Sequence, residues 1–193
     1  MPSPKILVMS GSLRPRSHNA RLAAWVVKEL TLIDVETTRI SLEDYRMPIY
    51  DPDEEIKSGP PQSAIKLKQM MTAHQGIFIT TPEHNASIPA VLKNAIDWVS
   101  RVRERGDPAF SAFRNRVFAI ASASSEQQGG LRGLASLRDI LELGCGALVI
   151  PEQVAVPQAD AAFDDMDNPV PNAVANALRL ELARLVDMAR MMA

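Results

Sequence analysis

The chain of 193 residues has a single cysteine, almost no excess of either charge and no long apolar run. Because Cys145 stands alone, no intrachain disulfide can form, and nothing indicates an oxidising compartment. Cys145 is expected to be a small buried hydrophobic side chain, the usual role of a free cysteine. His18 and His74 have no partner at metal-ligand spacing, so no metal is expected.

The even charge balance and the short apolar runs argue against two further classes of protein. Lysine and arginine number 21 against 23 aspartate and glutamate residues, a formal net charge of −2, whereas general nucleic-acid binders usually show a basic excess. No stretch approaches the roughly 20 apolar residues that span a bilayer, and the apolar run at residues 6–9 is too short for a signal peptide. We therefore expect a cytoplasmic protein whose partners include neither nucleic acid nor a membrane.

What the sequence does contain is an alternation of short apolar runs with longer amphipathic ones. Strands are predicted at residues 5–10, 33–40, 76–80, 116–122 and 146–150, the last ending at Pro151. Helices are predicted at residues 19–31, 62–74, 88–103 and 130–143, and from residues 168–172 to about residue 190. The segment after the second strand is predicted to be rich in turns, because it holds Pro48, Pro52, Gly59, Pro60 and Pro61. This order implies one domain, residues 1–193, with a parallel sheet, right-handed crossovers and helices on both faces.

In such a sheet, ligands bind beyond the carboxyl ends of the strands, where the strand order reverses. The loop after the first strand, residues 10–19, leads straight into a helix and offers hydroxyl, amide and guanidinium groups from Ser12, Arg14, Ser17 and Asn19. The unpaired N–H groups and positive end of a helix can hold a phosphate. The loop matches neither a Walker A loop nor a G-x-G-x-x-G fingerprint. A plain turn with Ser17 or Asn19 as the helix cap explains the same residues.

The loops after the third and fourth strands are also unusual. In residues 80–89, Pro82 and Pro89 stiffen a polar cluster suited to lining a planar ligand; the alternative is a turn with Ser87 capping the next helix. In residues 122–130, Gly129 and Gly130 permit positive φ angles and close backbone approach to a ligand, although they also serve as a plain linker.

Together these loops resemble the NAD(P)H-dependent FMN reductase family. Gly11-Ser12-Leu13-Arg14, followed by Ser17 and Asn19, looks like its phosphate loop. Residues 81–98 are similar to its Pro-Glu-Tyr-Asn stretch and the helix behind it, and residues 122–151 also fit. The resemblance implies a flavodoxin-like three-layer sandwich, with a five-stranded parallel sheet of order 2-1-3-4-5 and helices on both faces.

The resemblance also implies the chemistry of the protein. FMN would be the cofactor, NADPH or NADH the electron donor, and free flavin, a quinone, an azo compound or a metal oxyanion the small acceptor, in a ping-pong cycle. Relatives form homodimers or homotetramers, and residues 45–50 correspond to a loop that helps to build the oligomer. No catalytic side chain is expected, because hydride transfer is the chemistry of the flavin itself.

The resemblance assigns the site residues loop by loop. The FMN phosphate would be held by Ser12, Arg14, Ser17 and Asn19. The flavin ring and ribityl chain would be flanked by Pro82, Glu83, His84 and Asn85. The other side of the flavin would be closed by Ser122, Ser124, Gly129 and Gly130.

Three departures from the family pattern stand out. His84 stands where tyrosine is usual, and Ala86 and Ala90 stand where glycine is frequent. Residues 125–128 replace a segment that is commonly rich in proline or glycine, and Glu126 would bring a carboxylate near a flavin edge. These departures leave open a protein that binds flavin or nucleotide without turnover. A low-molecular-weight phosphatase is disfavoured, because the first loop lacks the nucleophilic cysteine and its returning arginine.

Overall fold

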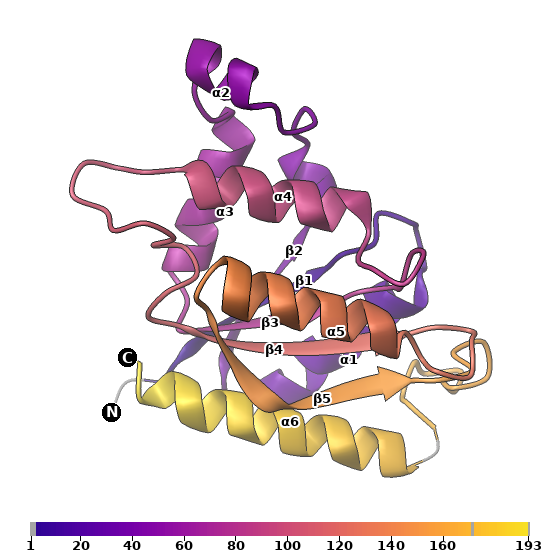
Figure 1. Ribbon diagram of the computed structural model, residues 1–193. Helices are drawn as coiled ribbons and strands as arrows, with labels where there is room; N and C mark the ends of the chain where they lie inside the picture. Colours follow the sequence, from indigo (N-terminus) through magenta and orange to yellow (C-terminus); the bar gives the residue numbers. More distant parts are fainter. Residues whose placement is uncertain (1–2, 171, 193) are drawn as a thin grey trace.

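The computed structural model describes residues 3–170 and 172–192 and contains a five-stranded parallel sheet between two layers of helices (Figure 1). The predicted order 2-1-3-4-5 is confirmed. The strands are β1 (Lys5–Ser10), β2 (Glu36–Ser41), β3 (Gly76–Thr80), β4 (Val117–Ala123) and β5 (Leu148–Val156).

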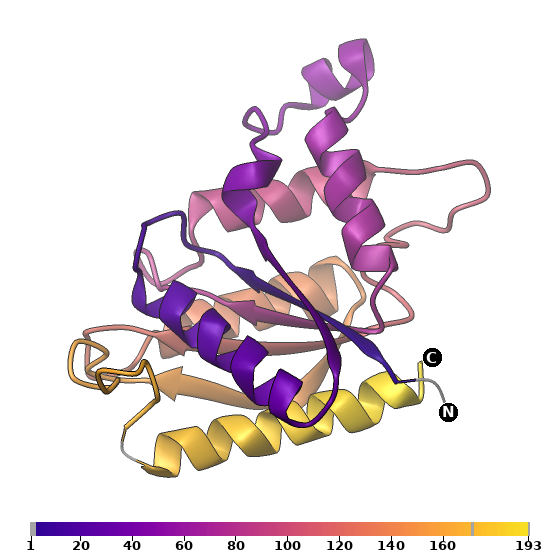
Figure 2. The same ribbon diagram turned by 180° about the vertical axis from the view of Figure 1, so that it is seen from behind.

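Helices cover both faces of the sheet. On one face lie α1 (His18–Leu32) and α6 (Asn172–Arg190), which are seen together from behind in Figure 2. On the other lie α3 (Gln62–Thr72), α4 (Ala90–Arg101) and α5 (Leu131–Asp139), the last continued by a π-helical turn, Ile140–Gly144. A short 3-10 helix, Leu42–Tyr45, and α2 (Pro52–Ser58) join β2 to α3. In the part of the chain that the structure describes, no helix is both long enough and apolar enough to cross a bilayer.

The buried strands explain why both faces carry helices. Successive side chains of β1 point to opposite faces, so Ile6 packs in the core beneath α1 and α6, whereas Leu7 packs in the core beneath α3, α4 and α5. Strands β3 and β4 are buried along their whole length. Burial on both faces is typical of a parallel sheet covered by helices on each side.

Two predicted strand boundaries and one predicted turn segment were wrong. Strand β2 begins at Glu36 rather than residue 33, because Ile33 is the C-cap of α1 and Asp34 turns the chain with φ 59°. The segment predicted as turns contains α2, whose N-cap Asp51 accepts a hydrogen bond from the N–H of Asp53, with Pro52 in the first turn.

Strand β5 does not end at Pro151 but continues to Val156. It is an edge strand, and its register with β4 shifts between Phe118 and Ile120. Proline is tolerated at an edge or a bulge because no ladder hydrogen bond is lost there. Pro171, in the segment predicted to open the last helix, lies outside the described residues.

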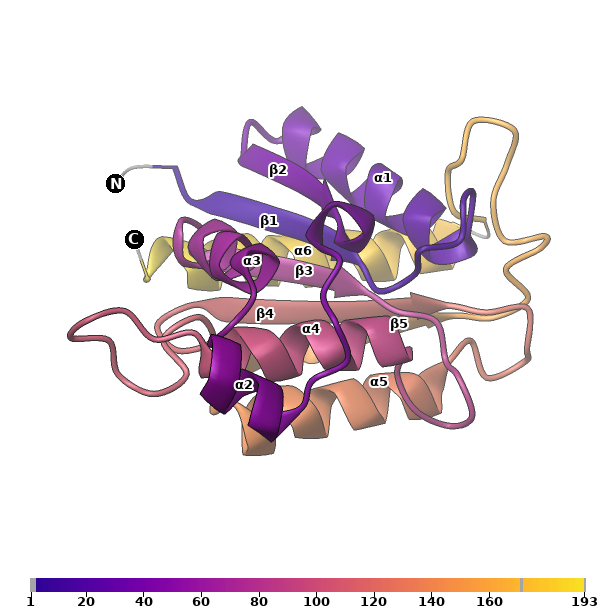
Figure 3. The ribbon, with the colours of Figure 1, turned by 90° about the horizontal axis from the view of Figure 1, so that it is seen from above.

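The carboxyl ends of the central strands are level with one another. Ser10 of β1 pairs with Thr80 of β3, and Thr80 pairs with Ala121 of β4. Chain connections run in opposite directions from β1 and β3, so the strand order reverses between them. The loops after β1, β3 and β4 therefore gather at one end of the sheet, away from both termini (Figure 3).

Candidate functional site

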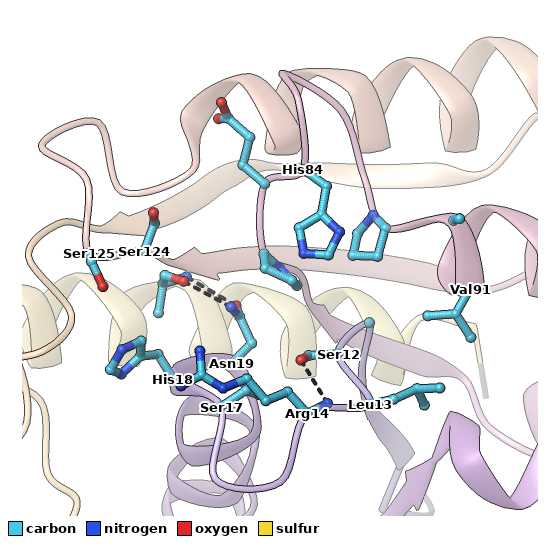
Figure 4. A pocket seen from close by; sticks show the side chains of 16 residues that line it. Ser12, Leu13, Arg14, Ser17, His18, Asn19, His84, Val91, Ser124 and Ser125 are labelled. Atoms are coloured by element: carbon cyan, nitrogen blue, oxygen red, sulfur yellow. Dashed lines mark hydrogen bonds between the residues drawn. The ribbon is translucent and has the colours of Figure 1, made fainter.

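A cleft of about 540 Å³ opens between these three loops (Figure 4). Its volume lies in the range usual for sites that bind small molecules or cofactors. Eight of the twelve residues expected at the site line it: Ser12, Arg14, Ser17, Asn19, Pro82, Glu83, His84 and Ser124. It is lined as well by Gly11, Leu13, His18, Pro89, Ala90, Val91, Ala123 and Ser125.

The first loop folds as a turn at the start of α1. Ser17 is the N-cap, and its Oγ accepts a hydrogen bond from the Ala20 N–H at 3.0 Å. The Oγ of Ser12 accepts from the Arg14 N–H at 3.3 Å, which holds the loop against itself. The first turn of α1 contains no acidic residue, and Arg14 makes no ion pair within the described residues. The helix dipole and the guanidinium therefore act together at this end of the cleft.

Asn19 is almost completely buried and ties α1 to β4. Its Nδ2 donates to the Ala123 carbonyl at 2.8 Å, and its Oδ1 accepts from the Ala123 N–H at 3.0 Å. The carbonyl of Asn19 also accepts from the Thr80 hydroxyl at 2.8 Å. Because both amide atoms pair with the Ala123 backbone, the side chain of Asn19 holds the loop in place.

The second loop contains a tight two-residue turn. The N–H of His84 donates to the Ser87 carbonyl at 2.8 Å, and the N–H of Ser87 donates back to the His84 carbonyl at 3.0 Å. Asn85 and Ala86 lie between them with φ of 51° and 64°, the conformation of a type I′ turn, which favours Asn-Gly. This turn directs the exposed His84 imidazole into the cleft, across from the first loop (Figure 4).

Ser87 does not cap α4, as one reading of the sequence expected. The N-cap of α4 is Pro89, and no side chain bonds the first turn. The hydroxyl of Ser87 instead lies 2.9 Å from the hydroxyl of Ser136 in α5. Ser87 precedes the N-cap Pro89 and is therefore not in the capping position, and its hydroxyl is used toward α5.

Glu83 lines the cleft, but its carboxylate caps α5. The N–H groups of Arg132 and Gly133 donate to Oε2 at 3.0 and 3.2 Å, and the Arg132 Nε donates to Oε1 at 2.6 Å. Burial raises the pKa of Glu83, but the hydrogen bonds from Arg132 and Gly133 outweigh it, so the pKa is lowered. Glu83 is therefore an ionised anchor between the second loop and α5.

Three of the expected residues shape the third loop without lining the cleft. Ser122 is fully buried, and its hydroxyl donates to the Gly129 carbonyl. Gly129 and Gly130 both have positive φ, of 61° and 87°. A Cβ on Gly129 would lie 2.8 Å from the Val156 carbonyl carbon, so only glycine fits this close approach.

A second pocket, of about 590 Å³, adjoins the first. The two share Glu83 and Ser124, and Asn85, which does not line the main cleft, lines this pocket instead. The lining is completed by Ala86, Glu126, Gln127, Gln128 and Arg132.

Sequence reasoning missed His18, whose side chain lines the main cleft. Its Nε2 lies 3.0 Å from Oδ1 of Asp160, in the segment after β5. The position of the helix start is the signal that could have found it. Because Ser17 is the N-cap, His18 is the first residue of α1, and it faces the same end of the cleft as Arg14 (Figure 4).

The groups that would support other chemistries are absent or remote within residues 3–170 and 172–192. These residues contain no cluster of three His, Cys, Asp or Glu side chains able to hold a metal. Cys145 is buried as expected, and burial raises the pKa of its thiol to about 11, so it is not a nucleophile at neutral pH.

Comparison with known proteins agrees with this geometry. Residues 4–161 match the family model of NADPH-dependent FMN reductases. The chain belongs to that family. It is thus an NAD(P)H-dependent oxidoreductase with FMN as its cofactor, in a flavodoxin-like fold.

Individual relatives of this FMN reductase family member have related names. An NAD(P)H-dependent FMN reductase of Pseudomonas aeruginosa is 33% identical over 162 residues, covering 83% of this chain and 81% of the relative. A quinone reductase of Escherichia coli is 32% identical over 138 residues, covering 71% and 69%. Among solved structures, the flavoenzyme NAD(P)H:(acceptor) oxidoreductase FerB of Paracoccus denitrificans superposes with a TM-score of 0.80 at 25% identity, covering 98% of each chain.

Proposed function

We propose that FMN lies in the main cleft with its phosphate on residues 10–19 and its ring between the second and third loops. The observation that carries this proposal is the first turn of α1, which has no acidic residue of its own, beside Arg14, which makes no ion pair in the described chain. The charge at this end suits a phosphate dianion. Ser12 and Ser17 add hydroxyls at the same end, and Asn19 holds the loop in position.

The other end of the cleft suits a planar ring with a polar edge. Pro82 and His84 line it from one side and Ser124 from the other. A Cβ on Gly129 would meet the backbone of Val156, and one on Gly130 would meet the Ser122 hydroxyl, which itself fixes this backbone from beneath. We propose that the third loop, held in this way, closes the other side of the flavin.

When bound, FMN accepts hydride from NADPH or NADH and then passes electrons to the acceptor, which is chemistry the cofactor supplies. The residues of the chain bind and orient it: Arg14 neutralises the phosphate, and His84 contacts the flavin. We propose a ping-pong cycle in which donor and acceptor use the same cleft in turn. The acceptor is a free flavin, a quinone, an azo compound or a metal oxyanion.

We further propose a single domain that works in the cytoplasm as a homodimer or homotetramer. The segment expected to form the interface includes Ile49, and α2 beside it presents Ile56; the two are 87% and 84% exposed. Apolar side chains exposed so fully and so close together are typical of a contact surface. Helix α2 stands away from the sheet in Figure 1.

Steady-state turnover separates the proposed reductase from a protein that binds flavin without catalysis. The FMN-loaded protein should oxidise NADPH or NADH when 1,4-benzoquinone or free FMN is present. A protein that keeps FMN but consumes neither nucleotide with either acceptor would establish the binding-only alternative instead.

A further inference from the structure

The second pocket differs in chemistry from the phosphate end of the cleft. Its side chains are three carboxamides, one hydroxyl and three charged groups, with no aromatic ring. Carboxamide N–H groups from Asn85, Gln127 and Gln128 can donate to carbonyl oxygens. Such a lining suits a small ligand with carbonyl acceptors.

The charges in this pocket do not cancel. Arg132 is engaged with Glu83, Nη2 lying 2.5 Å from Oε1. Glu126, the third charged residue, is exposed and makes neither an ion pair nor a side-chain hydrogen bond within residues 3–170 and 172–192. The pocket therefore carries one uncompensated negative charge.

The backbone holds Glu126 in this position. Its N–H donates to Ser124 Oγ at 3.2 Å, and its carbonyl accepts from the N–H groups of Gly129 and Gln158 at 3.1 and 3.3 Å. Because three hydrogen bonds fix the backbone at Glu126, the side chain projects from a fixed point on the wall of the pocket.

We infer that Glu126, where the second pocket adjoins the main cleft, makes the enzyme select uncharged carbonyl acceptors over anionic ones as they enter that cleft. The inference rests on the proposed function, because the second pocket shares Glu83 and Ser124 with the cleft proposed to hold FMN. Among the candidate acceptors, it favours quinone-like compounds and disfavours metal oxyanions.

The test compares E126Q with E36Q, a control that removes the same charge. Glu36 is exposed at the amino end of β2, at the opposite end of the sheet from the cleft, and pairs with Lys5. The acceptors are ferricyanide, an anion that takes one electron, and neutral 1,4-benzoquinone, which takes two. One NADPH therefore reduces two ferricyanide ions or one quinone.

A unit charge about 7 Å from another through water changes an equilibrium about threefold. E126Q should raise the ratio of kcat/KM for ferricyanide to kcat/KM for benzoquinone at least about threefold at low salt, since ferricyanide is multiply charged. The gain should shrink in 0.5 M salt, where charges are screened. E36Q should leave the ratio unchanged.

A second readout does not depend on turnover. Removing a carboxylate near the ring should favour the more negatively charged, two-electron reduced form of bound FMN. A threefold change corresponds to a midpoint potential about 14 mV higher in E126Q than in E36Q. Equal acceptor ratios or equal potentials in the two variants would overturn the inference. Failure of the unmodified protein to turn over NADPH with both acceptors would instead overturn the proposed function.

Discussion

Removing the Arg14 guanidinium should weaken FMN binding without affecting riboflavin. A hydrogen bond to a charged group contributes about 1.5–3 kcal/mol. Arg14 is exposed, so solvent screening places the loss near the lower bound, about 1.5 kcal/mol, or roughly tenfold in Kd. Riboflavin lacks the phosphate, so its affinity should not change. The assay is a fluorescence titration of the apoprotein with each flavin at low salt.

Arg16 provides the matched control for this prediction. It lies two residues away in the same loop, carries the same charge and does not line the cleft. Arg16→Ala should leave FMN affinity within about twofold, since only long-range attraction is lost. Equal weakening of FMN by Arg14→Ala and Arg16→Ala, or equal weakening of FMN and riboflavin by Arg14→Ala, would refute the phosphate assignment.

Three further variants test the loops themselves. Ala86→Gly should stabilise the protein by about 0.5–1 kcal/mol in urea unfolding, because glycine adopts the positive φ of the turn more easily; a loss of stability would contradict the type I′ conformation. Gly129→Ala should cost about 1–3 kcal/mol, since its Cβ would meet backbone at 2.8 Å, and an unchanged unfolding midpoint would show that the loop relaxes freely. Glu83→Gln should be less stable than the unmodified protein at pH 7. Because the folded pKa is lowered, this difference should persist above the ordinary value of 4.5 and disappear as the pH falls through the folded pKa; a constant difference would refute the charged cap.

Much of the fold could be predicted from local patterns. Buried strands such as β3 are short apolar runs ended by polar loops, and their alternation with helices allows few topologies. The missed α2 had its own local signals, Asp51 and Pro52, which the surrounding prolines obscured. The extension of β5 past Pro151 depends on an edge position and a bulge, which no local pattern reveals.

The place of the three loops at one end of the sheet could be predicted from the sequence better than the contacts of their side chains. Asn19 and Glu83 look like ligand-binding groups in the sequence, yet each is paired with a distant backbone, at Ala123 and Gly133. Those pairings form only after the sheet brings the loops together, so sequence spacing cannot reveal them. His18 was passed over for the converse reason: its place in the cleft depends on where α1 begins.

The central claim, that this chain holds FMN and reduces it with a pyridine nucleotide, is tested most directly by visible absorption. The protein is measured as purified, after addition of FMN and removal of excess, and then with NADPH or NADH under anaerobic conditions. The account predicts a bound-flavin band near the visible maximum of free FMN that bleaches with at least one of the two nucleotides. A protein that retains no FMN, or a bound band that neither nucleotide bleaches, would contradict it.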